Sequence, residues 1–93
     1  MFHRAGPGLG EIHEKVAEMA LVRSGSGAVV IGGKVVDGKV REPGEIRGPS
    51  IAGGTQIKVA AGDVIYIPAN QPHRFVPDPG KPISVMTFKF PSK

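Results

Sequence analysis

The sequence predicts an all-β domain, a sandwich or a barrel, and two observations indicate this. Short apolar, β-branched segments recur along the 93 residues, at intervals too short for the crossover helices of a parallel sheet. The 14 glycines and 9 prolines lie between these segments rather than in tracts, so they mark turns. No cysteine is present to supply a disulfide or a thiolate ligand. We expect one domain, residues 1–93, near the lower size limit for a self-sufficient core.

The apolar segments give the expected strands in chain order. They are residues 19–22, 28–31, 34–36, 56–60, 64–67, 73–76 and 83–90. Gly-, Asp- or Pro-containing turns separate them, and Asp37-Gly38 between two apolar runs is the strongest short hairpin signal. The stretch REPGEIRGPSIA, residues 41–52, receives no strand assignment and is expected to form a long loop over the mouth of the barrel.

The segment GEIHEKVAEMALVR, residues 10–23, fits two structures. Apolar residues near helical spacing, together with Glu, Lys and Ala, are compatible with one amphipathic helix that carries His13 on its polar side. However, the segment has no capping residue ahead of Ile12 and leads directly into a strand. Two strands joined by a turn near Val16-Ala17 fit the all-β remainder better.

Charge and hydropathy argue against two classes of partner. The net charge is +4, but Lys and Arg are spread singly along the chain without a basic run or interleaved aromatic residues. This pattern is typical of a solvated surface, so we expect no nucleic-acid binding. No apolar stretch has the length of a membrane span and no signal peptide is evident, which predicts a cytoplasmic protein without membrane contact.

The stretch GDVIYIPANQPHRF, residues 62–75, resembles the second motif of the cupin family, whose members are small jelly-roll β-barrels. The motif is Gly, five residues, Pro, one residue, Gly, two residues and His. Gly62, Pro68 and His73 match at this spacing, and Asn70 replaces the second Gly. Asn is the non-glycine residue that best tolerates a left-handed backbone, so the turn is compatible with that change.

The first cupin motif, His-x-His, three or four residues, Glu, six residues and Gly, is matched less closely. Glu18 and Gly25 fit its second half. Either His13 fills the second His position and Glu11 the first, or His13 fills the first and Lys15 the second. The resemblance covers residues 9–90 and implies a single-domain jelly-roll barrel.

The resemblance implies a divalent metal ion inside the barrel, held by Glu11, His13, Glu18 and His73. Imidazoles and carboxylates suit Fe, Mn, Ni or Zn, and the sequence does not distinguish these ions. Glu11, His13 and Lys15 share one face if their segment is extended, whereas His3 is expected outside the site. An inward Lys15 would oppose the cation, and its ammonium would then favour an anionic ligand.

Several apolar residues are candidates for the lining of a ligand pocket. Because side chains alternate along a strand, His73 and Phe75 should point inward and Arg74 outward. Tyr66 is also expected in the pocket, since a buried phenol needs a hydrogen-bond partner and could donate to a ligand. The other candidates are Val64, Met86 and Phe88.

Two functions are compatible with these residues. The first is a metal-dependent cupin that acts on a small organic molecule, with the metal as Lewis acid or oxygen activator. The second is a non-catalytic module that binds a sugar or an organic acid at a degenerate metal site. We also expect a homodimer, in which the segment 1–9 pairs with the sheet of the partner.

Overall fold

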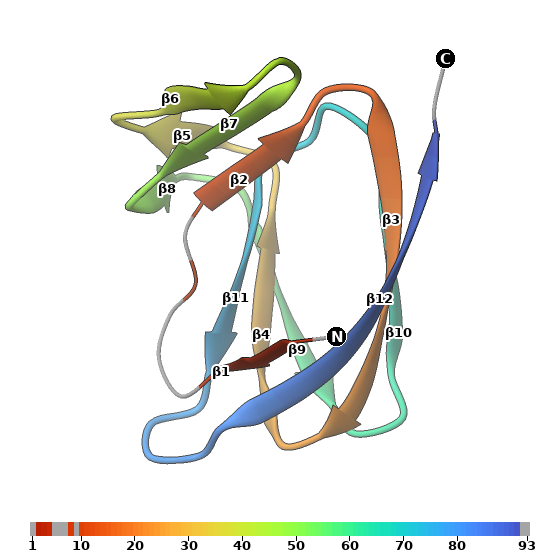
Figure 1. The fold of residues 1–93 in the computed structure, drawn as a ribbon. Helices are drawn as coiled ribbons and strands as arrows, with labels where there is room; N and C mark the ends of the chain where they lie inside the picture. Colours follow the sequence, from red (N-terminus) through yellow and green to blue (C-terminus); the bar gives the residue numbers. More distant parts are fainter. Residues whose placement is uncertain (1, 5–7, 9, 92–93) are drawn as a thin grey trace.

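In the computed structural model, residues 2–4, 8 and 10–91 are described, and within them the chain forms two facing antiparallel sheets and a smaller third one (Figure 1). The strands are β1 (Phe2–Arg4), β2 (Gly10–His13), β3 (Val16–Ser24), β4 (Ser26–Ile31), β5 (Lys34–Val36), β6 (Lys39–Glu42), β7 (Glu45–Gly48), β8 (Ser50–Ala52), β9 (Thr55–Ala60), β10 (Val64–Ile67), β11 (His73–Pro77) and β12 (Ile83–Pro91).

The two large sheets divide the chain into layers. One has the strand order β1-β12-β3-β10, and the other has the order β6-β7-β2-β11-β4-β9. Figure 1 shows β3, β10 and β12 on the right, facing β4, β9 and β11. None of the described residues is helical, which confirms the predicted all-β fold. Accordingly, this part of the chain has no helix of the length and apolarity that a membrane crossing requires.

An aliphatic core lies between the two large sheets. In β10 the buried residues are Ile65 and Ile67, and in β11 the inward-facing Phe75 is 4% exposed. The remaining core residues come mainly from β3, β4, β9 and β12; they are Ala20, Val22, Val29, Val59, Ile83 and Val85. The strict alternation of burial in β10 and β11 follows from the period of two along a strand.

The third sheet, β5-β8, covers the outer face of β2 and β7. A Cβ atom at Gly48 would lie only 2.3 Å from the carbonyl oxygen of Val36, and one at Gly10 would lie 2.8 Å from Ile51 Cγ1. Glycine at these two positions therefore allows the close approach of the small sheet. Because the outer face of β2 is covered in this way, its alternate residues Glu11 and His13 face the interior.

The structure decides between the two predicted forms of residues 10–23. The segment forms β2 and β3, joined by a turn at Glu14-Lys15. The helix is therefore wrong, and the turn lies two residues before the expected Val16-Ala17. Pairing of β3 with β10 and β12 over most of its length outweighs the helix propensity of its residues.

Two further expectations need correction. Residues 41–52 are not a loop, because they contain β7, β8 and the end of β6. Asp37-Gly38 forms a turn, with Asp37 at a φ of 52°, but it does not connect the two strands of a hairpin. Strand β5 pairs with β8, and β6 pairs with β7.

The N-terminal strand lies in the chain's own sheet. Strand β1 pairs with β12 through the register Phe2↔Val85 to Arg4↔Ile83. The segment expected to pair with a partner molecule therefore has an intramolecular partner over these three residues. Residues 1, 5–7 and 9 of that segment lie outside the described residues.

The core assignment predicts different costs for the same substitution at two strand positions. Val29→Ala removes two methyl groups from a fully buried site in β4 and should lower the free energy of unfolding by about 2–3 kcal/mol. Val40→Ala, at a site that is 69% exposed in β6, should change it by no more than about 0.5 kcal/mol. Urea unfolding of both variants at one protein concentration measures the difference, and equal costs would contradict the assignment.

Candidate functional site

Two buried histidines lie side by side at one end of the sandwich. His13 is the last residue of β2, and His73 is the first residue of the neighbouring strand β11. In the pairing of these two strands, His73 lies opposite Glu11. The ring centroids are 5.2 Å apart with an angle of 43° between the planes, and the residues are 5% and 4% exposed. The two rings therefore meet inside the sandwich, and they come from adjacent strands of one sheet.

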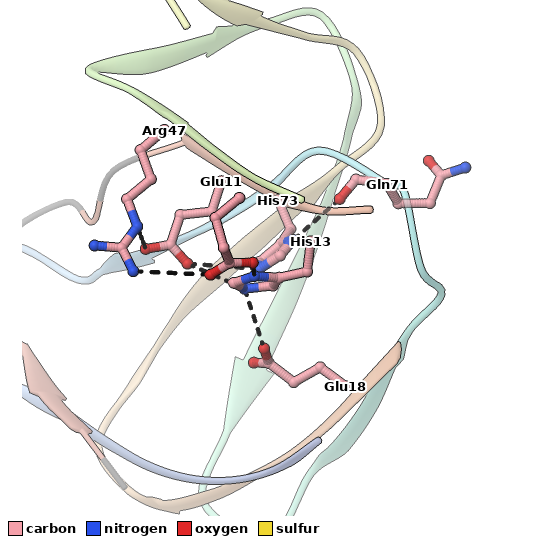
Figure 2. Close-up of polar contacts among 7 residues, drawn as sticks. Glu11, His13, Glu18, Arg47, Gln71 and His73 are labelled. Atoms are coloured by element: carbon pink, nitrogen blue, oxygen red, sulfur yellow. Dashed lines mark hydrogen bonds and ion pairs between the residues drawn. The ribbon is translucent and has the colours of Figure 1, made fainter. Parts of the chain in front are cut away.

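Two glutamates approach the Nε2 atoms of these histidines (Figure 2). Glu11 Oε2 lies 3.5 Å from His13 Nε2 and 3.9 Å from His73 Nε2. Glu18 Oε1 lies 3.6 Å from His13 Nε2 and belongs to β3, so it reaches the site from the opposite sheet. Glu18 is 5% exposed, and a buried carboxylate of this kind needs a positive or hydrogen-bonding partner.

The Nδ1 atoms of the same histidines are bonded to other groups. His73 Nδ1 donates to the carbonyl oxygen of Gln71 over 3.1 Å, and His13 Nδ1 contacts the carboxylate of Glu45. Both acceptors hold the ring hydrogen on Nδ1. Each neutral imidazole therefore carries its free lone pair on Nε2, which faces Glu11.

Glu45 and Arg47 belong to the site but had no place in the sequence prediction. In β7 they pair with His13 and Glu11, respectively. Arg47 Nε lies 3.6 Å from Glu11 Oε1, and Arg47 Nη2 lies 4.0 Å from Glu45 Oε1. Charged and uncharged residues alternate in EIRG, residues 45–48, which is the pattern of a strand with one charged face. The sequence analysis assigned no strand there, so this signal was missed.

Mutual contacts shift the pKa values of the central groups. The contact with His13 lowers the pKa of Glu11 against the opposing effect of burial, and His73 and Arg47 make smaller contributions in the lowering direction. The contacts with Glu11 and Glu45 raise the pKa of His13. Burial lowers the pKa of His73, and the neighbouring His13 acts in the same direction. These shifts favour the protonated form of His13 and the neutral form of His73.

The turn between β10 and β11 fixes the position of both histidines. Asn70 adopts a φ of 64°, the left-handed conformation expected at the position where cupins usually have Gly. Its backbone N–H donates to the carbonyl oxygen of His13 over 2.8 Å, and the N–H of Gly32 donates to that of Pro72 over 2.8 Å. The turn is thereby bonded to β2 on one side and to the end of β4 on the other.

A pocket of about 620 Å³ opens directly beside His13. The turn residues Glu14 and Lys15 form part of its wall, and Lys89 of β12 contributes from the opposite sheet, where it pairs with Glu18. The remaining lining residues are Val16, Pro43, Gly44, Glu45 and Asn70. The pocket therefore combines one edge of the His-Glu cluster with two lysines.

The other predicted pocket residues lie elsewhere. Phe75 is buried in the core and does not line this pocket. Tyr66 points away from the interior and is 56% exposed, so the expected burial of its phenol is wrong. Val64 and Phe88 are exposed on the same outer face, where Met86 is half-buried. Lys15 does line the pocket, but from the turn rather than from the inward face shared by Glu11 and His13.

The distances within the cluster are compatible with a shared metal ion. Two atoms bound to one ion at about 2.0–2.2 Å are at most about 4.4 Å apart, and the three separations of 3.5, 3.6 and 3.9 Å satisfy this limit. Glu11, His13 and His73 form one group of candidate ligands, whose ligand atoms lie within 4.8 Å of one another, whereas Glu18 is not part of that group and contacts only His13 among them. Nδ1–H donation to a carboxylate and to a carbonyl is also the usual outer arrangement of metal-binding histidines.

Comparison with known proteins supports the fold. Residues 50–93, just under half of the chain, match the family model of the AraC-like ligand binding domain, which is a cupin-fold family. The all-β structure and this match support a small domain with a cupin-like jelly-roll fold. The matched part contains β8 to β12, and with them the turn that precedes His73. The curated proteins and the solved structures gave no match to this domain.

The left-handed turn predicts the effect of two substitutions at one position. Asn70→Val should lower the free energy of unfolding by about 1–2 kcal/mol, because a β-branched residue resists a positive φ. Asn70→Gly should stay within about 1 kcal/mol of the parent, because glycine adopts this conformation without steric cost. Thermal and urea unfolding measure both, and equal destabilisation by Val and Gly would refute the role of the backbone conformation.

Proposed function

We propose that this cupin-like domain binds a small organic anion at a divalent metal ion held by Glu11, His13, Glu18 and His73. One observation carries the proposal: both buried imidazoles direct Nε2 toward one carboxylate, while acceptors of the protein hold both Nδ1 hydrogens. Such an arrangement aligns two nitrogen lone pairs and a carboxylate oxygen on a common point. A histidine that merely satisfies a core hydrogen bond does not require this alignment.

The charges of the cluster support a divalent cation. The cluster contains three carboxylates, those of Glu11, Glu18 and Glu45, and one guanidinium, that of Arg47. The formal excess of two negative charges equals the charge of such an ion, and burial makes an uncompensated excess unfavourable. The contacts with Glu11 and Glu45 raise the pKa of His13, which favours a proton there, and such a proton would offset part of the excess when no metal is bound.

The chemistry of the donors limits the choice of ion. Two imidazole nitrogens and two carboxylate oxygens suit Fe, Mn, Ni or Zn, and an octahedral ion would retain positions for a ligand. When bound, the ion would supply Lewis acidity to an oxygen of that ligand. The chain itself supplies the remaining contacts: Glu45 orients the His13 ring, and Arg47 interacts with the outer oxygen of Glu11.

Lys15 and Lys89 make the pocket suitable for an anion. They line it from two sides, and Glu14 is the opposing exposed charge in the same wall. Since Glu45 is paired with His13 and Arg47, the two ammonium groups outnumber the remaining carboxylate. A ligand with a carboxylate could therefore contact a lysine and also reach an ion held at His13.

A second candidate function is metal-independent ligand binding without catalysis. The similarity of residues 50–93 to a ligand-binding domain favours it, because that family is described by binding rather than by a reaction. In this case the proton on His13 would take the place of the metal charge, and the lysines would bind the anion directly. The two candidates differ in whether removal of metal abolishes ligand binding.

Substitutions within the cluster should weaken metal binding to different extents. His73→Ala removes a ligand atom and should raise the Kd for Mn²⁺ or Zn²⁺ by more than about 100-fold. Glu45→Gln keeps the ligands but alters the partner of His13 Nδ1, and it should raise the Kd by about 10- to 100-fold. Isothermal titration of protein stripped with a chelator and made without a His-tag measures both values.

Glu42→Gln provides a matched control for the glutamate, since Glu42 is exposed on β6 and outside the cluster. It should leave the Kd unchanged. Folded protein that binds none of the four ions, checked by circular dichroism, would eliminate the metal proposal and leave the metal-independent candidate.

Loss of the pocket lysines should weaken the binding of acids selectively. The double variant Lys15→Met/Lys89→Met should bind succinate or benzoate about ten-fold more weakly at low salt, because each exposed charge contributes up to about 1 kcal/mol. Its affinity for the metal should remain within a few-fold of the parent value. Isothermal titration and thermal shift of the metal-loaded protein measure these effects.

The control Lys34→Met/Lys81→Met has the same net charge, but both lysines are exposed outside the pocket. It should bind the acids as the parent does. Erythritol and benzyl alcohol serve as uncharged probes of similar size. Equal binding of acids and uncharged probes by the parent would refute the preference for an anion.

A further inference from the structure

The outer face of the four-stranded sheet is apolar over three adjacent strands. Met19, Tyr66 and Phe88 form one row across the sheet, because Met19 pairs with Tyr66 on one side and with Phe88 on the other. Leu21, Val64 and Met86 form the next row, and Ala17 and Phe90 follow beyond the first. None of these eight residues is charged. We refer to them together as the outer apolar face.

Much of this face is accessible to solvent. Five of its members are exposed large hydrophobic residues; they are Met19 (37%), Val64 (59%), Tyr66 (56%), Phe88 (47%) and Phe90 (45%). A side chain of an aromatic residue has about 150–250 Å² of surface, so the five together expose on the order of 400 Å². The largest apolar patch on a typical monomer has about 300–600 Å², and such a patch is often functional.

We infer that the outer apolar face is the interface of a homodimer, in which two copies pack sheet against sheet. Aromatic residues and Met are enriched in the centre of protein interfaces, where charged residues are depleted. The exposed area is about half of the roughly 800 Å² that each partner buries in a standard interface, and a polar rim would supply the rest. The inference does not depend on the proposed metal or ligand.

The arrangement of the rows suits a second copy of the same chain. With a two-fold axis along β3, the β3 strands of both copies face each other and β10 of each copy faces β12 of the other. Tyr66 would then lie against the partner's Phe88, and Phe88 against the partner's Tyr66. The chain carries a net charge of +4, so two copies repel each other overall, and a face without charged side chains adds no local repulsion between like charges.

The interface would also be connected to the functional site. Side chains alternate along β3 and β12, so Met19 and Phe88 face outward while their neighbours Glu18 and Lys89 face the interior. Packing of a second copy would therefore restrain the two strands that carry these groups. This mode differs from the edge pairing that the sequence suggested, since β1 already pairs with β12.

Light scattering after gel filtration and analytical ultracentrifugation, at about 1–100 µM protein, test the inference. The parent chain should have twice the monomer mass, and Phe88→Glu should raise the dimer Kd by at least about 100-fold, because a charge would be buried at the centre of the interface. Val40→Glu, at a site that is 69% exposed on β6, should leave the dimer intact. Circular dichroism verifies that both variants fold.

Two single-cysteine variants test the same interface if Phe88→Glu does not fold. The chain has no cysteine of its own, so Met19→Cys places a single thiol at the centre of the face, on the two-fold axis. Under mild oxidation it should give a disulfide-linked dimer at least about ten-fold faster than Val40→Cys. A parent that is monomeric throughout the concentration range, or a dimer unaffected by Phe88→Glu, would overturn the inference.

Discussion

The site depends on the antiparallel pairing of β2 with β11 on one side and with β7 on the other. The registers His73↔Glu11 and His13↔Glu45 bring the cluster onto one inner face, together with Arg47 opposite Glu11. Because side chains alternate along a strand, a shift of one residue in β2 would turn Glu11 and His13 outward. The close approach of the β5-β8 sheet at Gly10 and Gly48 opposes such a shift, since no larger side chain fits there. The packing of the outer layer thus maintains the chemistry of the inner one.

The parts of the structure that depend on local sequence could be predicted. The turn from Gly62 to His73 has punctuation, alternation and a left-handed Asn70 that are all encoded within a dozen residues. The pairing of β2 with β7 joins segments more than thirty residues apart, so nothing near His13 indicated Glu45 or Arg47 as partners. Tyr66 was misplaced for a different reason. Alternation in VIYI is compatible with either face being inward, and the aromatic residue was assumed to be the buried one.

The two ends of the sandwich differ in how they are stabilised. Around Val22, Val29 and Val85 the sheets meet through aliphatic side chains alone, and removal of these from water stabilises the fold. At the other end, histidines and glutamates replace the aliphatic residues, and each is buried at a cost that only mutual contacts offset. For a chain of 93 residues, this is a large fraction of polar interior. A domain of this size has little stability in reserve, which fits a role for further contacts from a bound ion or a second copy.

Glu18 is the one proposed ligand that comes from the four-stranded sheet, whereas Glu11, His13 and His73 all belong to the six-stranded sheet. On the proposed assignment, a cation would be coordinated by residues of both sheets and would cross-link the two layers. Spreading of the layers at that end would then stretch a coordination bond. Separation of the two sheets at this end and dissociation of the bound ion would consequently be the same motion, so the rate of the first would set the lifetime of the second.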